Sequence, residues 1–285
     1  MLSYFQAALL GILQGITELF PISSLGHSIL LPALLGWTVN QNANYFLTSL
    51  VATHFATAAV LFFLYWSDWR RIISGILRSI AQRTVSGDAD GKLGWLLIVG
   101  TVPAGLVGII FQKKVQGFFT SPSYVAGFLV LNGVLLYTAE LLGRKAKKNV
   151  AEGDTDERIA KEISWRQSMG VGIMQILALL PGFSRTGSTI AGGLLVGMAH
   201  EDALRFSFLL ATPIIAAAAA IKLPMLFASR DVREIETALV GAICAAVGSY
   251  LSVIFLTRYF KTRTLNPFAV YCLAFGILSL IFLRS

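Results

Sequence analysis

Charge is what this sequence has least of. Only 13% of its 285 residues are Asp, Glu, Lys or Arg, whereas 55% are hydrophobic, and the mean hydropathy is +0.71. A soluble domain would carry about twice that charged fraction, which argues against a soluble globular protein. The apolar residues form long runs rather than ten-residue alternating segments, which argues against an outer-membrane β-barrel. We therefore predict an all-α polytopic membrane protein.

Cysteine is also scarce. The two cysteines, Cys244 and Cys272, both lie in apolar runs, which indicates neither a disulfide framework nor a cysteine metal site. The net charge of +8 is typical of the basic cytoplasmic loops of a membrane protein, so we expect no nucleic-acid partner.

Uninterrupted apolar runs predict six transmembrane helices, since about 20 residues cross a bilayer core. Two further apolar regions are broken, 2–36 at Pro21 and 165–199 at Pro181-Gly182. The piece after each break has roughly 14 residues and reaches only about 21 Å, so we predict two re-entrant helical hairpins. The six predicted spans are 45–66, 94–112, 123–142, 204–228, 237–257 and 266–283.

The distribution of basic residues predicts the orientation. With re-entrant hairpins and an extracytoplasmic N-terminus, 16 of the 23 Lys and Arg residues fall on the inside. This excess is what the positive-inside rule expects, and it places both termini outside. The six basic residues then predicted to lie outside are Lys113, Lys114, Lys222, Arg230, Arg233 and Arg284.

The same layout predicts an inverted repeat within a single membrane domain. Residues 1–142 and 164–285 each contain one hairpin and three spans, and 143–163 is a charged cytoplasmic linker. A weak echo joins "QGITELFPISSLGHSILL" and "QILALLPGFSRTGSTIAGGLL", in which Gln, Pro, Ser and Gly recur in order. The hairpin tips would then meet near the midplane, where broken helices of such repeats form substrate sites.

The first break carries polar residues that can do chemistry. Gln14 and Glu18 share one helix face, and a carboxylate at this depth is costly unless it is paired or functional. Ser23 or Ser24 can cap the short helix that follows, whose N-terminus would attract an anion. His27, about one turn further, could exchange a proton near neutral pH.

The second break adds a cation. Arg185 presents a planar donor fork suited to phosphate oxygens, so two hydroxyl-rich helix N-termini with one Arg predict a phosphate or diphosphate site. We expect Glu18, with Gln14, to ligate a divalent cation, Mg²⁺ or Ca²⁺, that bridges phosphate oxygens. The hydroxyl residues around Arg185 are Ser184, Thr186, Ser188 and Thr189.

Each of these residues also has a purely structural explanation. A single Ser or Thr in a membrane helix often only caps or packs, Glu18 could be a structural ion-pair partner of Arg185, and His27 a structural hydrogen bonder. Their occurrence together at two related breaks favours a functional site. His54, in the middle of a predicted span, either faces this site or packs. We expect structural roles for Glu140, His200, Glu201 and Asp202.

Two motifs identify a resemblance that covers the whole chain. "QGITE" fits E/Q-x-x-x-E and "PGFSRTGST" fits PGxSRSxxT, the motifs of the undecaprenyl-pyrophosphate phosphatases of the bacitracin-resistance family. "FPISSLGH" is also similar to the family's segment after the first motif. Two departures stand out. Gln14 leaves Glu18 as the only carboxylate of the first motif, and Thr186 replaces the second Ser of the other motif.

The resemblance implies hydrolysis of undecaprenyl diphosphate to undecaprenyl phosphate and inorganic phosphate in the bacterial inner membrane. This reaction recycles the lipid carrier of peptidoglycan synthesis and confers bacitracin resistance. Our hypothesis for the mechanism is that Arg185 holds the diphosphate and that Ser24 is the nucleophile, with Glu18 or His27 as base. Direct attack by water is the alternative. We expect substrate-binding roles for Gln14, Ser23, Ser184, Thr186, Ser188 and Thr189.

The competing class is a transporter, because broken helices in inverted repeats are also a transporter plan. Such a protein would be a transporter or flippase of a polyprenyl phosphate lipid. We expect the site to open to the periplasmic or outer face, since the hairpin with Glu18 enters from there. The small residues of "AGGLLVG" are compatible with a homodimer.

Overall fold

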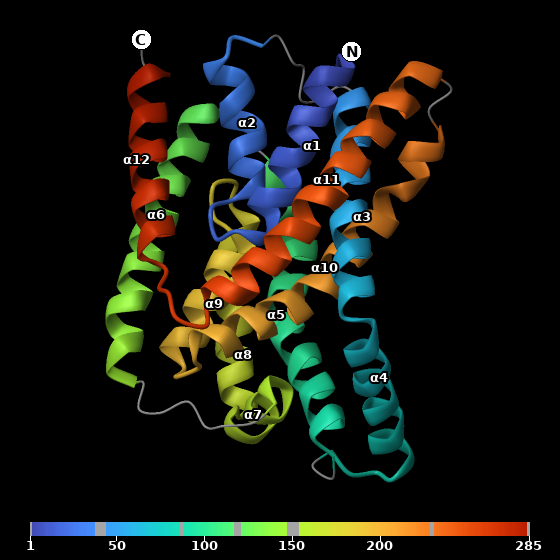
Figure 1. Cartoon of the computed structure of the whole chain (residues 1–285), viewed down its shortest axis with the longest axis vertical. Coiled ribbons are helices and arrows are strands. Elements are labelled where there is room, and N and C mark those ends of the chain that lie inside the picture. Colours follow the sequence, from blue (N-terminus) through green and yellow to red (C-terminus); the bar gives the residue numbers. More distant parts are fainter. Residues whose placement is uncertain are drawn as a thin grey trace.

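The computed structural model describes residues 2–37, 44–85, 88–116, 121–146, 154–228 and 231–283. These ranges are built from helices and contain no strand (Figure 1). The helices are α1 (Tyr4–Leu19), α2 (Ser24–Leu34), α3 (Asn44–Leu64), α4 (Trp66–Ala81), α5 (Ala89–Gln116), α6 (Pro122–Ala146), α7 (Thr155–Glu162), α8 (Trp165–Gln175), the 3₁₀ helix η2 (Ile176–Leu179), α9 (Arg185–Leu195), α10 (His200–Ala228), α11 (Val232–Tyr259) and α12 (Asn266–Phe282).

Within the described ranges four helices are long and apolar enough to cross a membrane, and they match four of the six predicted spans. They are Tyr45–Leu64, Ala89–Phe111, Pro122–Gly143 and Val232–Tyr259. The predicted span 266–283 corresponds to α12, an apolar helix of 17 residues. The predicted span 204–228 lies within α10, where the side chains of residue 219 and of 221–228 fall outside the described part. The described part of the chain is thus all-helical, as expected of a polytopic membrane protein.

Both predicted breaks are present. α1 ends at Leu19 and α2 begins at Ser24, so the break falls around Pro21. α8 passes into η2, which ends at Leu179, and α9 begins at Arg185. Each first arm starts with a Ser-x-x-Gln capping box, at Ser3 and at Ser164. These caps satisfy backbone N–H groups at the beginning of both arms.

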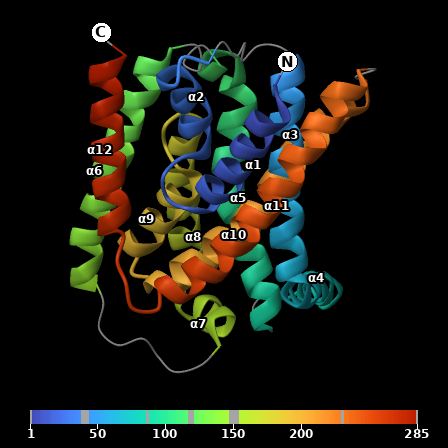
Figure 2. The same cartoon turned by 45° about the horizontal axis from the view of Figure 1, so that its top comes forward.

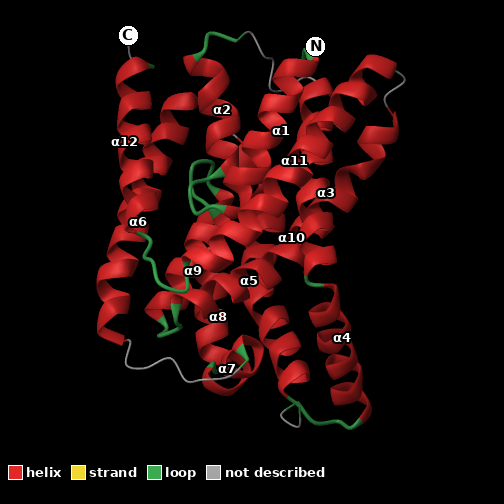
Figure 3. Ribbon diagram, viewed as in Figure 1, coloured by secondary structure: helices red, strands yellow, loops and turns green. Residues whose placement is uncertain are grey.

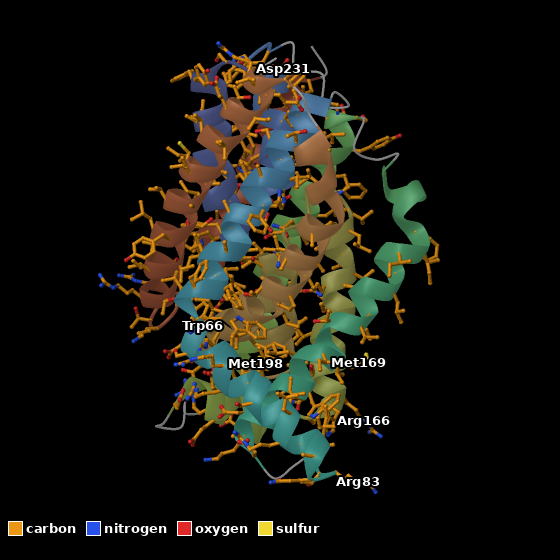
Figure 4. The ribbon with its side chains drawn as sticks, turned by 90° about the vertical axis from the view of Figure 1, so that its right-hand side faces the viewer. Trp66, Arg83, Arg166, Met169, Met198 and Asp231 are labelled. Carbon is orange, nitrogen blue, oxygen red and sulfur yellow. The ribbon has the colours of Figure 1, made fainter. Side chains whose placement is uncertain are left out.

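The two hairpins approach each other from opposite ends of the molecule. Figures 1 and 2 show α1 and α2 entering from the end that holds both chain termini, and α8 and α9 entering from the other end. Their non-helical tips lie next to each other in the middle of the bundle (Figure 3). Asp231 lies at the first end, whereas Arg83 and Arg166 lie at the opposite one (Figure 4). The re-entrant placement in a bilayer stays a prediction.

Close helix crossings hold the first hairpin in place. α1 packs along α11, and α11 also packs along α3. A Cβ added at Gly11 or at Gly15 would lie 2.2 Å from the backbone oxygen of Gly241 or of Ala245, respectively. Only glycine therefore allows α1 and α11 to cross at this distance, as small residues do in membrane helix pairs.

The "AGGLLVG" segment packs inside the chain. A Cβ at Gly192 would lie 3.1 Å from Cβ of Met174, and a Cβ at Gly193 would lie 2.8 Å from Cβ of Ala203. These small residues therefore serve contacts of α9 with α8 and α10, and the predicted homodimer stays a prediction that must rest on another surface.

The predicted linker is partly helical. α6 extends to Ala146, residues 147–153 lie outside the described ranges, and α7 follows. Asp156 of α7 accepts hydrogen bonds from Nε and Nη2 of Arg205 on α10, both at 3.0 Å. It also pairs with Arg71 of α4. This buried ionic contact attaches the linker to the bundle at the end opposite the termini.

Five of the six basic residues predicted to lie outside have side chains beyond the described part of the chain. They are Lys113, Lys114, Lys222, Arg230 and Arg284. The sixth, Arg233, stacks its guanidinium over the ring of Tyr4 at 4.4 Å.

Candidate active site

Glu18 is the centre of a buried cluster at the first hairpin tip. It lies near the end of α1, and only 8% of the residue is exposed. Nε2 of Gln14, one turn earlier, donates to Glu18 Oε2 at 3.0 Å. The predicted shared helix face is therefore formed, because residues four apart on a helix are neighbours.

Ser24 completes the first half of the cluster. Its hydroxyl donates to Oε2 of Glu18 across the break, from the first residue of α2. A hydroxyl hydrogen-bonded to a carboxylate is the arrangement of a nucleophile beside its general base. Glu18 and Ser24 are six residues apart, so on a continuous helix they would point in different directions. The break at Pro21 therefore brings the Ser24 hydroxyl to Glu18.

Arg185 reaches the same carboxylate from the second hairpin. Its Nη2 donates to Oε1 of Glu18, which makes an ion pair between the two tips. Its Nη1 is buried and has no hydrogen-bond partner among the described residues. An unpaired buried guanidinium nitrogen is costly, so this donor is available to an anionic ligand beside Ser24 and Glu18.

Most of the other hydroxyls hold the backbone of the tips. Ser23 and Ser184 are the N-caps of α2 and α9, and their Oγ atoms accept from Gly26 N and Gly187 N. Ser184 Oγ also donates to the Phe20 carbonyl at 3.2 Å. Their capping role accounts for their presence at the tips without substrate, and their predicted contact with substrate stays a prediction.

The threonines of α9 make similar contacts. Thr186 Oγ1 donates to the carbonyl of Glu18 at 3.0 Å, which ties the two hairpins together. Thr189 Oγ1 bonds the carbonyl of Arg185 at 2.9 Å and lies 2.6 Å from Oγ of Ser207. The hydroxyl of Ser188 is buried with no partner in the described part of the chain. The departure from the motif at Thr186 thus keeps a hydroxyl that forms a hydrogen bond, and the added methyl group does not prevent it.

His27 makes its hydrogen bonds away from Glu18. Its Nδ1 lies 2.7 Å from the Ser23 carbonyl oxygen and its Nε2 2.7 Å from the Tyr271 hydroxyl. The ring stacks on Tyr271 and Phe275 and is 2% exposed. Of the two bases expected from the sequence, Glu18 is thus the one in contact with Ser24.

Asn132, which had no predicted role, and His54, for which the sequence left packing or the site open, both join the site. Asn132 of α6 is fully buried, and its Nδ2 donates to the Pro21 carbonyl at 3.0 Å. Its Oδ1 accepts from Ser184 N at 3.1 Å, so one side chain bridges both breaks. His54 of α3 lies 3.2 Å from Gln14 Nε2. The sequence signal for both residues was a polar side chain in the middle of a predicted apolar span.

The residues expected to be structural have structural partners. Glu140 is buried and accepts from His200 Nε2 at 2.7 Å and from Leu265 N at 3.0 Å. Asp202 pairs with Arg158 of α7 at 2.7 Å. These contacts lie outside the Glu18 cluster, and they join α6 and α7 to the start of α10.

The donor set does not form a ready divalent-cation site in this arrangement. Both oxygens of Glu18 already accept hydrogen bonds, and Gln14 turns its NH₂ group rather than its oxygen toward the carboxylate. No group of three His, Cys, Asp or Glu side chains in the described ranges could hold a metal ion. The expected Mg²⁺ or Ca²⁺ stays a prediction.

Comparison with known proteins agrees with the motifs. The model of the family described as bacitracin resistance protein BacA matches residues 7–278. The chain belongs to this family. It is 44% identical to the undecaprenyl-diphosphatase of Mycolicibacterium paratuberculosis, over 99% of this chain and 98% of the relative. It is also 43% identical to the undecaprenyl-diphosphatase of Acidiphilium cryptum, over 96% of each chain, and 38% identical to undecaprenyl-diphosphatase 2 of Frankia alni, over 97% of each.

Proposed function

We propose that this BacA-family protein is an integral membrane phosphatase that hydrolyses undecaprenyl diphosphate to undecaprenyl phosphate and inorganic phosphate. The names of its relatives, at up to 44% identity over nearly the whole chain, support this substrate. The observation that carries the proposal is the Ser24–Glu18–Arg185 cluster. It joins a hydroxyl, a carboxylate that can take its proton, and a guanidinium with a free nitrogen.

The cluster supports a two-step phosphoryl transfer. Ser24 Oγ attacks the terminal phosphorus while its proton passes to Glu18, and the bond from phosphorus to the bridging oxygen breaks. Undecaprenyl phosphate leaves. Water then attacks the phosphorus of the phosphoserine and the bond from phosphorus to Ser24 Oγ breaks. Glu18 returns its proton to Oγ, one hydrogen of the water stays on the inorganic phosphate that leaves, and the other passes to solvent. Direct attack by a water that Glu18 activates is the alternative, and it needs no phosphoserine.

Arg185 stabilises the charge that develops on the transferred phosphoryl group. Phosphoryl transfer depends chiefly on positioning and on such fixed donors. Because Glu18 occupies Nη2 and leaves Nη1 without a partner, the diphosphate can bind Nη1 before the ion pair opens. The N-termini of α2 and α9, capped by Ser23 and Ser184, add backbone N–H groups beside it.

The membrane setting fits a polyprenyl substrate. The tail can stay in the lipid while the diphosphate reaches the two tips in the middle of the bundle. Within this proposal the protein lies in the bacterial inner membrane with both termini outside, and the site opens to the periplasmic face. Its product is the lipid carrier that peptidoglycan synthesis reuses, and depletion of the diphosphate form gives bacitracin resistance.

The deciding experiment measures phosphate release by the purified protein with undecaprenyl diphosphate, for wild type and Arg185→Ala. The same preparations are placed in liposomes to measure translocation of the lipid between leaflets. Hydrolysis that Arg185→Ala abolishes supports the enzyme. Translocation without hydrolysis by the wild type would identify a transporter and overturn the proposal.

The divalent cation is tested separately. The protein is treated with EDTA, and phosphate release is measured before and after Mg²⁺ or Ca²⁺ is added back. Recovery on addition supports the predicted cation, with Glu18 as the one carboxylate of the cluster to hold it. Full activity in EDTA would show that the donors of this chain suffice.

A further inference from the structure

The ring orientation of His54 is fixed by the backbone of its own helix. His54 Nδ1 lies 2.7 Å from the carbonyl oxygen of Leu50, one turn earlier on α3. A carbonyl oxygen can only accept, so Nδ1 carries the hydrogen. In the neutral ring Nε2 is then an acceptor, and it points away from Leu50 toward α1.

The acceptor of His54 faces the amide of Gln14. His54 Nε2 lies 3.2 Å from Gln14 Nε2, and an amide nitrogen can only donate. The second hydrogen of the same NH₂ group goes to Glu18 Oε2 at 3.0 Å. One amide nitrogen therefore bridges the imidazole and the carboxylate, whose nearest atoms are 3.6 Å apart.

These two bonds decide which way the Gln14 amide faces. Its oxygen, Oε1, is buried and has no partner in the described part of the chain, so nothing at that end orients the group. If the amide turned over, its oxygen would face Glu18 Oε2 and both atoms would be acceptors. The same oxygen would also face the lone pair of His54 Nε2, which is a second acceptor, so that orientation is unfavourable toward both neighbours.

We propose that His54 is a positioning residue of this active site: it orients Gln14, and Gln14 in turn holds Glu18 Oε2 against the Ser24 hydroxyl. This inference rests on the proposed phosphatase function. It also gives a physical reason for the departure from the family motif. A glutamate in place of Gln14 has no hydrogen to share, whereas a glutamine must be turned the right way.

The test compares steady-state kinetics of purified variants with undecaprenyl diphosphate. His54→Leu removes the acceptor, and His54→Gln restores an acceptor oxygen near the position of Nε2. We expect kcat of His54→Leu to fall by about 10–100-fold, as when an outer partner of a functional group is removed, while KM changes less than about 2-fold. His54→Gln should recover most of the lost kcat.

A double-mutant cycle separates positioning from simple packing. If His54 acts through Gln14, then His54→Leu adds little to the loss already caused by Gln14→Leu. Phe55→Leu, a 47% exposed neighbour on α3, is the matched control and should keep wild-type kinetics. Melting temperatures of all variants in detergent show whether a kinetic loss follows from unfolding.

Three results would overturn the inference: unchanged kcat in His54→Leu, additive losses in the cycle, or a loss confined to KM. Failure of His54→Gln to recover activity while it stays folded would also count against it. A wild-type protein without phosphate release would instead reject the proposed function, so the two failures are distinguishable.

Discussion

Glu18 and Arg185 form an ion pair between residues 167 positions apart in the chain. Each comes from a different hairpin tip, and each side chain is mostly buried, with 8% and 15% exposed. The pair neutralises two mostly buried charges at the meeting point of the tips. It also places the only guanidinium of the two breaks against the only carboxylate, so the site exists only when both hairpins meet.

Arg185→Lys should retain a positive charge and lose the planar fork. We expect phosphate release to fall by roughly 100-fold or more, since removal of a fixed donor to a developing anion costs about 10²–10³. Arg185→Ala should also destabilise the protein by about 3–5 kcal/mol, because it leaves Glu18 buried without its partner. Kinetics and thermal unfolding in detergent measure both. Wild-type activity in Arg185→Lys would show that a point charge suffices.

Ser24→Ala removes the proposed nucleophile and should lower kcat by at least about 100-fold. Ser28→Ala, one turn further along α2, is the control and should retain activity. Phosphate release gives the rate, and mass spectrometry of acid-quenched wild type should find phosphate on Ser24. If Ser24→Ala keeps most of its activity, water attacks directly and the covalent step is wrong.

Glu18→Gln keeps the shape of the side chain and removes its basicity. We expect kcat to fall by roughly 10²–10⁴, the usual contribution of a general base. The ion pair with Arg185 is lost as well, so the melting temperature must be measured beside the rate. Substantial turnover by a folded Glu18→Gln protein would assign the base to another group, and His27 would be examined next.

Asn132→Leu should loosen the contact between the tips. The change leaves the Pro21 carbonyl and the Ser184 N–H without their buried partner, and each lost partner costs about 1–3 kcal/mol. We expect a lower melting temperature together with lower activity. Leu131→Ala, at a neighbouring position that is 51% exposed, is the control. An unchanged melting temperature in Asn132→Leu would contradict the bridging role.

Gly182→Ala should disrupt the second tip. Gly182 has φ +112°, and a Cβ there would lie 2.4 Å from the Val125 carbonyl oxygen. Strain and clash together should destabilise the protein by about 2 kcal/mol or more. Gly105→Ala is the matched control, because a Cβ at Gly105 has no atom within 4 Å. Equal melting temperatures for the two variants would rule out this explanation.

Local periodicity and the length of the apolar runs were enough to predict much of this protein from its sequence. Apolar runs predicted the four described helices that are long and apolar enough to span a bilayer, because crossing it needs about 20 apolar residues. Pro21 and Pro181-Gly182, each beside a run of Ser and Gly, predicted the breaks, because proline removes a helical hydrogen bond and these polar neighbours favour caps and turns. The shared face of Gln14 and Glu18 followed from the helical repeat alone.

Contacts between distant elements were decided only by the tertiary structure. Whether His27 or Glu18 faces Ser24, whether His54 packs or joins the site, and what Asn132 bridges all depend on how α1, α3, α6 and α12 pack. The partners concerned lie 40 residues apart for Gln14 and His54, 111 for Asn132 and Pro21, and 244 for His27 and Tyr271. A helical repeat fixes neighbours within a turn or two, whereas such pairs depend on close helix crossings such as that of Gly15 with Ala245.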